Sequence, residues 1–156
     1  MKTESNVKTV MASQHVVYAR MSDLNNVGKV RERFDDPDFQ QQLSQQVPDD
    51  QKIEEIRERL DSMQFDADSV SMDVPPIGNV AIRIIEREPE KCIKFESINS
   101  PIHFYMWVQL LPLTDTTSRM RLTVEADVNP FMRMMVEKPL REGVEKLADM
   151  LASLPY

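Results

Sequence analysis

Few residues in this chain have side chains suited to metal binding or covalent catalysis. The histidines are His15 and His103, and the single cysteine is Cys92. A metal site needs several convergent His, Cys or carboxylate ligands, and neither histidine has a partner at a ligand-like spacing. Cys92 with a distant histidine would suit nucleophilic chemistry, but a small residue within a strand explains Cys92 more simply. We therefore predict no metal site and no catalytic residues.

The composition also argues against a nucleotide cofactor or a nucleic-acid partner. The chain has three glycines among 156 residues, and they form no glycine-rich phosphate loop. Acidic residues outnumber basic residues by 26 to 19, which gives a formal charge of −7. Nucleic acids and anionic membranes attract basic surfaces instead. We therefore expect no cofactor, no nucleic-acid partner and no electrostatic docking to an anionic membrane.

Three features of the sequence predict a cytoplasmic protein. A single cysteine cannot form a disulfide framework, which fits a reducing compartment. The first ten residues, MKTESNVKTV, lack the long apolar core of a signal peptide. No run approaches the 18 apolar residues that a membrane-spanning helix needs. We therefore expect no integral membrane contact.

The rest of the chain is organised around one terminal segment, Asn129–Leu154, which predicts a long helix. Asn129 is a favourable N-cap, and Pro130 suits the first helical turn. Residues 131–136 are apolar nearly all round, which predicts burial on several sides. Pro139 predicts a kink or a break. Apolar residues recur with the helical period and form one face: Met132, Val136, Leu140, Val144, Leu147 and Leu151.

Alternating apolar and polar residues before this helix predict an antiparallel sheet. Turn residues separate the strands closely, as in a meander with one wet face. An earlier β-branched run predicts a first strand at the N-terminus. The expected strands are Asn6–Ala12, Val70–Val74, Val80–Ile84, Ile93–Phe95, Ile102–Leu113 and Met120–Val128.

Helical segments are expected between the first strand and the meander. Ser13 can cap the first of two short helices. The glutamine-rich segment Asp35–Pro48 fits a turn or two of amphipathic helix or a mobile loop equally well. A clearer helix follows it, with Ile53, Leu60 and other apolar residues on one stripe. We predict one α+β domain over residues 1–156, with a polar and helical insertion at 35–63.

This order of elements resembles the START-like superfamily, which has the helix-grip fold and includes polyketide cyclases, lipid-transfer domains and plant pathogenesis-related allergens. The sequence phrases Ile84–Pro89, Lys94–Glu96, Trp107–Leu110 and Leu140–Ala148 are similar to bacterial members. The resemblance covers most of the chain except the insertion at Asp35–Leu60. It implies a curved antiparallel sheet wrapped around the terminal helix, with a cavity between them for an apolar small molecule or lipid.

One long strand is apolar on both faces, so its register decides which residues face the helix. Phe104, Met106, Val108 and Leu110 alternate with Tyr105 and Trp107. A five-residue turn before the next strand would place the even-numbered residues inward, beside Met120, Leu122, Val124 and Ala126. A four-residue turn would reverse this. We prefer the first arrangement, which leaves Tyr105 and Trp107 outside as a surface for a partner or a homodimer.

The leading functional hypothesis is noncatalytic binding of an apolar small molecule or lipid-like ligand. One alternative is a polyketide cyclase or dehydratase type of enzyme, which needs an acid or base inside the cavity. Another is a protein-interaction module that uses the outer sheet face. The predicted ligand-binding residues are Val80, Ile82, Phe95, Phe104, Met106, Val108, Leu122, Val124, Met132, Met135, Val136 and Leu140.

Overall fold

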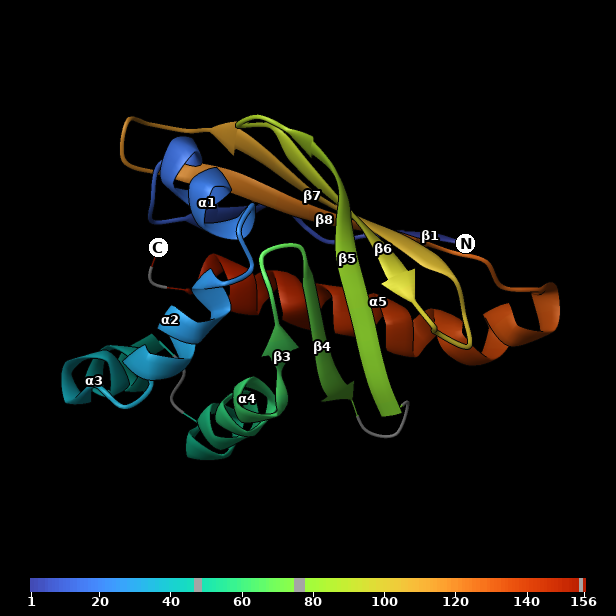
Figure 1. Ribbon diagram of the computed structural model, residues 1–156, viewed down its shortest axis with the longest axis horizontal. Coiled ribbons are helices and arrows are strands. Elements are labelled where there is room, and N and C mark those ends of the chain that lie inside the picture. The colour runs from blue at the N-terminus through green and yellow to red at the C-terminus, as the bar shows by residue number, and fades with distance from the viewer. Residues whose placement is uncertain (47–48, 75–77, 155) are drawn as a thin grey trace.

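The terminal helix, α5 (Pro130–Ala152), lies across one face of a curved antiparallel sheet (Figure 1). The structure is a computed structural model that describes residues 1–46, 49–74, 78–154 and 156. Within these residues the strand order is β1-β8-β7-β6-β5-β4-β3, and β2 also pairs with β8. The eight described strands are β1 (Lys2–Glu4), β2 (Lys8–Val10), β3 (Gln64–Phe65), β4 (Ser69–Val74), β5 (Gly78–Glu88), β6 (Cys92–Ile98), β7 (Phe104–Pro112) and β8 (Ser118–Ala126).

The register between β7 and β8 confirms the preferred orientation of the long strand. Met106 pairs with Val124 and Val108 pairs with Leu122, and all four side chains are buried. Residues 113–117 form the five-residue connection that this register requires. Tyr105 and Trp107 therefore lie on the outer face, away from α5. All pairings between the described strands are antiparallel, so the predicted α+β meander with a terminal helix is confirmed.

The predicted first strand, Asn6–Ala12, is observed as the shorter β2, and an unpredicted strand, β1, precedes it; both pair with β8. Ser5 lies in the gap between them and is 5% exposed. Its backbone N–H donates to the Leu122 carbonyl, and its Oγ accepts from the Leu122 N–H at 3.0 Å. The Ser5 side chain thus replaces a missing ladder bond, which lets the chain bend without leaving a buried N–H unsatisfied.

Four helices connect β2 to β3 within the described residues: α1 (Gln14–Met21), α2 (Asn26–Arg33), α3 (Pro37–Gln46) and α4 (Asp50–Ser62). Ser13 caps α1 by accepting from the Val16 N–H, as predicted. Of the two alternatives for the glutamine-rich segment, a helix is observed up to residue 46. Its next two residues lie outside the described part. Phe39 of α3 packs with Phe34 and Leu60 in a small cluster separate from the main core, which explains why this polar segment is helical.

The helix α5 differs in burial between its two halves. Val144 and Ala148 in the second half are 4% and 0% exposed. The first half was predicted to be buried on several sides, and this is wrong: Phe131, Met134 and Met135 are 73%, 85% and 66% exposed. The reason is that α5 packs on β1, β2 and β8, so only one side of its first half faces the sheet.

Of the predicted kink or break at Pro139, the break does not occur, because α5 is continuous through that residue, and the kink stays a prediction. Proline removes one backbone hydrogen bond and crowds the carbonyl four residues earlier. Pro139 is exposed. Water can therefore satisfy the carbonyl that loses its partner, and the helix continues.

An ionic cluster attaches the second half of α5 to β2. The Lys8 Nζ lies 2.7 Å from a Glu145 oxygen and 2.8 Å from an Asp149 oxygen. The Asn6 backbone N–H also donates to Glu145. The hydrogen bond from Lys8, assisted by the one from Asn6, lowers the pKa of Glu145 below its ordinary value of 4.5. The same cluster raises the pKa of Lys8, mainly through the hydrogen bond to Asp149.

We predict that Glu145→Gln lowers stability at neutral pH but much less in acid. A lowered carboxyl pKa contributes stability above pH 4.5, and this contribution is lost as the pH falls through the folded-state pKa. The pair is partly exposed, so the loss should be less than about 1 kcal/mol. Urea unfolding of both proteins at neutral pH and at about pH 3 would measure it. An equal difference at both pH values would contradict this role of Glu145.

Candidate functional site

The inner face of the sheet becomes less buried toward the end where α5 begins. A cross-strand row in the middle of the sheet, Ile84, Phe95, Met106 and Val124, is at most 7% exposed. Ile82 and Phe104 lie one row nearer the start of α5 and are only half-buried. Val80 lies further along β5 and is also half-buried. The core is therefore incompletely covered at this end.

The helix side shows the same change in burial. The apolar face of α5 that buries Val144 continues through Leu140 and Val136 to Met132, at steps of four residues. These three side chains are only half-buried. Leu140 still packs against the core, whereas Met132 and Val136 lie outside the core cluster, as Val80 does. We call this set the exposed core end: Val80, Ile82, Phe104, Met132, Val136 and Leu140.

The structure divides the predicted ligand-binding residues into three groups. Val80, Ile82, Phe104, Met132, Val136 and Leu140 form the exposed core end. Met135 is exposed on α5. The other five are packed in the core, with no more than 6% of their surface accessible: Phe95, Met106, Val108, Leu122 and Val124. Sequence reasoning left out Val70 of β4, which pairs with Ile82 and is also half-buried. Its place in the alternating pattern already put it on the same face as Ile82.

Polar groups are scarce on the inner face of β6, β7 and β8. The inward-facing positions of these strands are apolar apart from Ser97 and Ser118. The Ser97 Oγ accepts a hydrogen bond from the Phe104 N–H, and the Ser118 Oγ donates to the Ala12 carbonyl. Both hydroxyls therefore already have structural roles. The chemistry of this surface is suited to burying apolar atoms.

The histidines and the cysteine lie apart from the exposed core end. His15 on α1 contacts Glu90 at 2.7 Å and is exposed. His103 contacts Glu96 and Asp127 on the outer side of the sheet. Burial, reinforced by Glu88 and Glu86, raises the pKa of the Cys92 thiol, which disfavours the reactive thiolate. In the described part of the chain, no three His, Cys, Asp or Glu residues are grouped as metal ligands would be.

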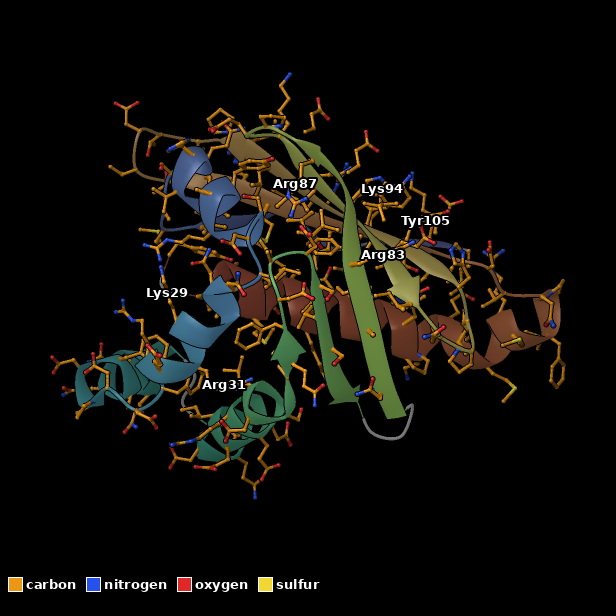
Figure 2. The ribbon with its side chains drawn as sticks, in the orientation of Figure 1. Lys29, Arg31, Arg83, Arg87, Lys94 and Tyr105 are labelled. Atoms are coloured by element: carbon orange, nitrogen blue, oxygen red, sulfur yellow. The ribbon has the colours of Figure 1, made fainter. Side chains whose placement is uncertain are left out.

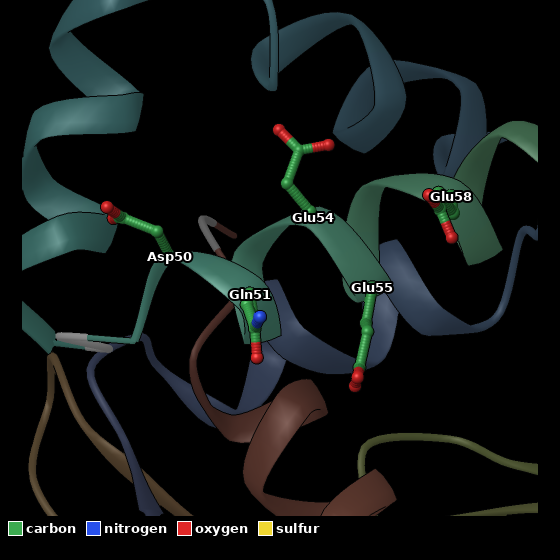
Figure 3. A pocket seen from close by; sticks show the side chains of 5 residues that line it. All are labelled: Asp50, Gln51, Glu54, Glu55 and Glu58. Atoms are coloured by element: carbon green, nitrogen blue, oxygen red, sulfur yellow. The ribbon is translucent and has the colours of Figure 1, made fainter.

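Two of the surface hollows that described residues line contain no residue of the exposed core end, although the smaller of the two reaches Val70. The larger, of about 430 Å³, follows α4 and is lined by Asp50, Gln51, Glu54, Glu55 and Glu58 (Figure 3). The side chains of this row are exposed, as expected for the solvated face of a helix. The second, of about 340 Å³, lies at the edge formed by β3, β4 and β5 and includes Phe65 and Ile98. Among the described helices, none is long and apolar enough to span a membrane.

Comparison with known proteins finds similarity at the level of structure alone. No family model matches the chain, and no curated protein sequence matches it. Norcoclaurine synthase from Thalictrum flavum has a TM-score of 0.63 at 14% identity, over 97% of this chain and 85% of that chain. An uncharacterised protein from Bacillus thuringiensis has a TM-score of 0.57 at 10% identity, over 97% and 96%. A conserved protein from Geobacillus kaustophilus has a TM-score of 0.56 at 13% identity, over 97% and 90%.

Identities this low establish a shared fold and leave activity open. In this chain the fold consists of the antiparallel sheet in the order β1-β8-β7-β6-β5-β4-β3 and the long terminal helix that the sheet curves around. The sequence phrases in β5, β6, β7 and α5 led to the same assignment. The chain therefore has a helix-grip fold.

Proposed function

We propose that this protein binds an apolar small molecule or lipid-like ligand at the exposed core end. The proposal rests on two half-buried apolar surfaces that both belong to the exposed core end. Val80, Ile82 and Phe104 supply one from the sheet, and the first half of α5 supplies the other. Apolar side chains that keep accessible surface beside a packed core gain free energy when a ligand covers them.

Burial alone can supply useful affinity at such a site. Each buried methylene contributes about 0.8 kcal/mol. A ligand that buries about 15 methylene groups would gain roughly 12 kcal/mol, and an association cost of about 4 kcal/mol would leave roughly 8 kcal/mol, which corresponds to a micromolar dissociation constant without any ion pair. The absence of a free polar anchor among the inward-facing residues of β6, β7 and β8 favours ligands with long or bulky hydrocarbon parts.

We favour binding without catalysis. A cyclase or dehydratase reaction needs an acid or base beside the substrate. The polar group nearest the exposed core end on β6 is Ser97, whose oxygen already accepts the Phe104 N–H at 3.0 Å. We also propose that binding takes place in the cytoplasm, because a free cysteine such as Cys92 persists there.

One structural neighbour supports the idea that this fold accommodates small molecules. A second structure of norcoclaurine synthase from Thalictrum flavum is a complex with dopamine and hydroxybenzaldehyde, and it has a TM-score of 0.60 with this chain. The identity is 15%, so the reaction of that enzyme is not carried over. The comparison supports a ligand role for the fold and leaves the chemical class to the residues of this chain.

Dye binding to the wild-type protein tests the proposal. An environment-sensitive apolar dye should become brighter in the presence of the protein, and this signal should saturate at micromolar protein concentration. Long-chain fatty acids, sterols and aromatic hydrocarbons, added one at a time, should include a class that displaces the dye. Polar metabolites of similar size should not displace it. Failure of every apolar class to bind would refute the proposed function.

A further inference from the structure

The outer face of the sheet carries two neighbouring rows of side chains that run across five strands. The cross-strand register defines both rows. Each of the five strands contributes one residue to the first row and another residue to the second row. The Trp107 row consists of Glu86, Lys94, Trp107, Thr123 and Glu4. The Tyr105 row consists of Arg83, Glu96, Tyr105, Glu125 and Lys2.

Aromatic rings and one cation occupy the centre of these rows. The Lys94 Nζ lies 4.6 Å from the Tyr105 ring centre and 5.2 Å from the Trp107 ring centre. The two rings are 6.0 Å apart and half-buried. Figure 2 shows Arg83, Lys94 and Tyr105 near one another in this region. Tyrosine, tryptophan and arginine are enriched at protein interfaces, whereas the solvated face of an antiparallel sheet usually carries polar residues.

The order of charges makes this surface complementary to itself. Consider a two-fold axis that is parallel to the sheet, perpendicular to the strands and midway between the two rows. Rotation about this axis places the Trp107 row of one copy opposite the Tyr105 row of the other copy. Lys94 then faces Glu96, Arg83 faces Glu86, and Lys2 faces Glu4. Tyr105 faces Trp107. Thr123 is 3% exposed and its hydroxyl donates to Gln109 of the same chain, so it and the opposing Glu125 form no pair across the axis. Each of the other residues in the two rows meets an oppositely charged or aromatic partner, and no like charges are opposed.

We propose that a second copy of this chain binds to this face and forms a symmetric dimer. The two rows contain three basic and four acidic residues, so the face is nearly neutral although the chain carries −7. Self-repulsion therefore acts mainly through other surfaces. Two sheets in such a dimer would pack about 10 Å apart with nearly aligned strands. This inference is independent of the ligand proposal, because it uses the opposite face of the sheet.

The dimer is expected to be weak. The sheet curves around α5, so its outer face is convex and contact concentrates on β6, β7 and β8 (Figure 1). Three strands spaced by about 4.8 Å and two rows spaced by about 6.8 Å cover roughly 200 Å² of sheet. This is below the standard interface of about 800 Å² per partner. We therefore expect a dissociation constant in the micromolar range or weaker.

Sedimentation velocity over a concentration series tests whether the wild type associates. Trp107 is the single tryptophan of the chain, so its emission reports directly on this face. We expect dimer formation as the concentration rises, with a blue shift of the Trp107 emission at the same midpoint. Wild type that remains monomeric throughout would overturn the proposal. Association without any change in Trp107 emission would also overturn it, because the interface would then lie elsewhere.

Charge reversal tests the proposed symmetry. Lys94→Glu places two glutamates opposite each other across the axis, and Glu96→Lys places two lysines opposite each other. Each variant alone should associate at least tenfold more weakly than wild type. An equal mixture of the two should form a heterodimer, because both cross-axis pairs then have opposite charges. Lys29→Glu on α2 and Glu54→Lys on α4 are the matched controls, since both residues are exposed and remote in sequence. These controls should dimerise as wild type does.

Several outcomes would overturn the proposal. Unchanged association of both single variants would show that this face is not the interface. Two weakened variants that fail to associate when mixed would show that Lys94 does not meet Glu96 across an axis. Circular dichroism checks that each variant is folded. If either central variant unfolds, Lys2→Glu and Glu4→Lys repeat the experiment at the edge of the face, where both side chains are more than 40% exposed.

Discussion

Replacing Val136 with tryptophan is expected to weaken binding of an apolar ligand by more than tenfold. Val136 is half-buried on α5 and lies outside the core cluster. A tryptophan there would cover the surface that the ligand is proposed to occupy. Displacing only two buried methylenes would remove about 1.6 kcal/mol, which exceeds the 1.4 kcal/mol that corresponds to a tenfold change. Dye titration of the variant and the wild type would measure this difference.

The control for this experiment is Glu142→Trp. Glu142 is exposed on the same helix and is not part of the exposed core end. This variant adds the same side chain to α5 without covering the proposed site, so it should bind the dye as wild type does. Both variants should keep the wild-type unfolding midpoint to within a small margin, because neither residue belongs to the packed core. Equal binding by Val136→Trp and wild type would place the ligand site elsewhere.

Replacing Leu122 with alanine is expected to lower the free energy of unfolding by about 2–5 kcal/mol. Leu122 is 0% exposed and pairs with Val108, which is also 0% exposed. The variant would lose the transfer free energy of the removed atoms and leave a cavity in the middle of the sheet's inner face. Urea unfolding followed by circular dichroism would measure the change.

Met135→Ala is the comparison for this prediction. Leu122 and Met135 were both predicted from the sequence to line a ligand cavity, but Met135 is 66% exposed. Removing its side chain should change stability by no more than about 0.5 kcal/mol. A similar cost for both substitutions would mean that α5 is packed along its whole length, and that its first half has no accessible face for a ligand.

The main elements of the fold were predictable because each has a strong local pattern. The terminal helix was predicted from the N-cap Asn129, from Pro130 in the first turn and from apolar residues that recur every three or four positions. Asn129 does cap α5, with its side chain accepting from the Met132 N–H at 2.8 Å. The inward side of β7 was preferred from the sequence because it matched the apolar set of β7 with the apolar set of β8, and the observed register confirms it. The division between β1 and β2 was not predictable, because it depends on Ser5 binding the backbone of Leu122, far along the chain.

The candidate site was only partly predictable. Alternation along strands identifies which face a residue is on, and it placed Val80, Ile82 and Phe104 correctly on the inner face. Alternation does not indicate how far α5 covers the apolar residues on the inner face of the sheet. Burial of Val108 and exposure of Met135 depend on where α5 crosses the sheet, which is set by packing against β1, β2 and β8. The number of apolar residues in 131–136 therefore overstated the burial of the first half of α5.

Methyl NMR of the wild-type protein with a bound apolar ligand tests the proposed function most directly. The exposed core end contains Val80, Ile82, Val136 and Leu140, all of which carry methyl groups that can be labelled and assigned by substitution. We predict that their signals shift first and most as the dye or a displacing ligand is added, while those of Val108 and Leu122 shift less. Shifts confined to residues outside the exposed core end, or the absence of shifts with every apolar ligand class, would contradict the proposal.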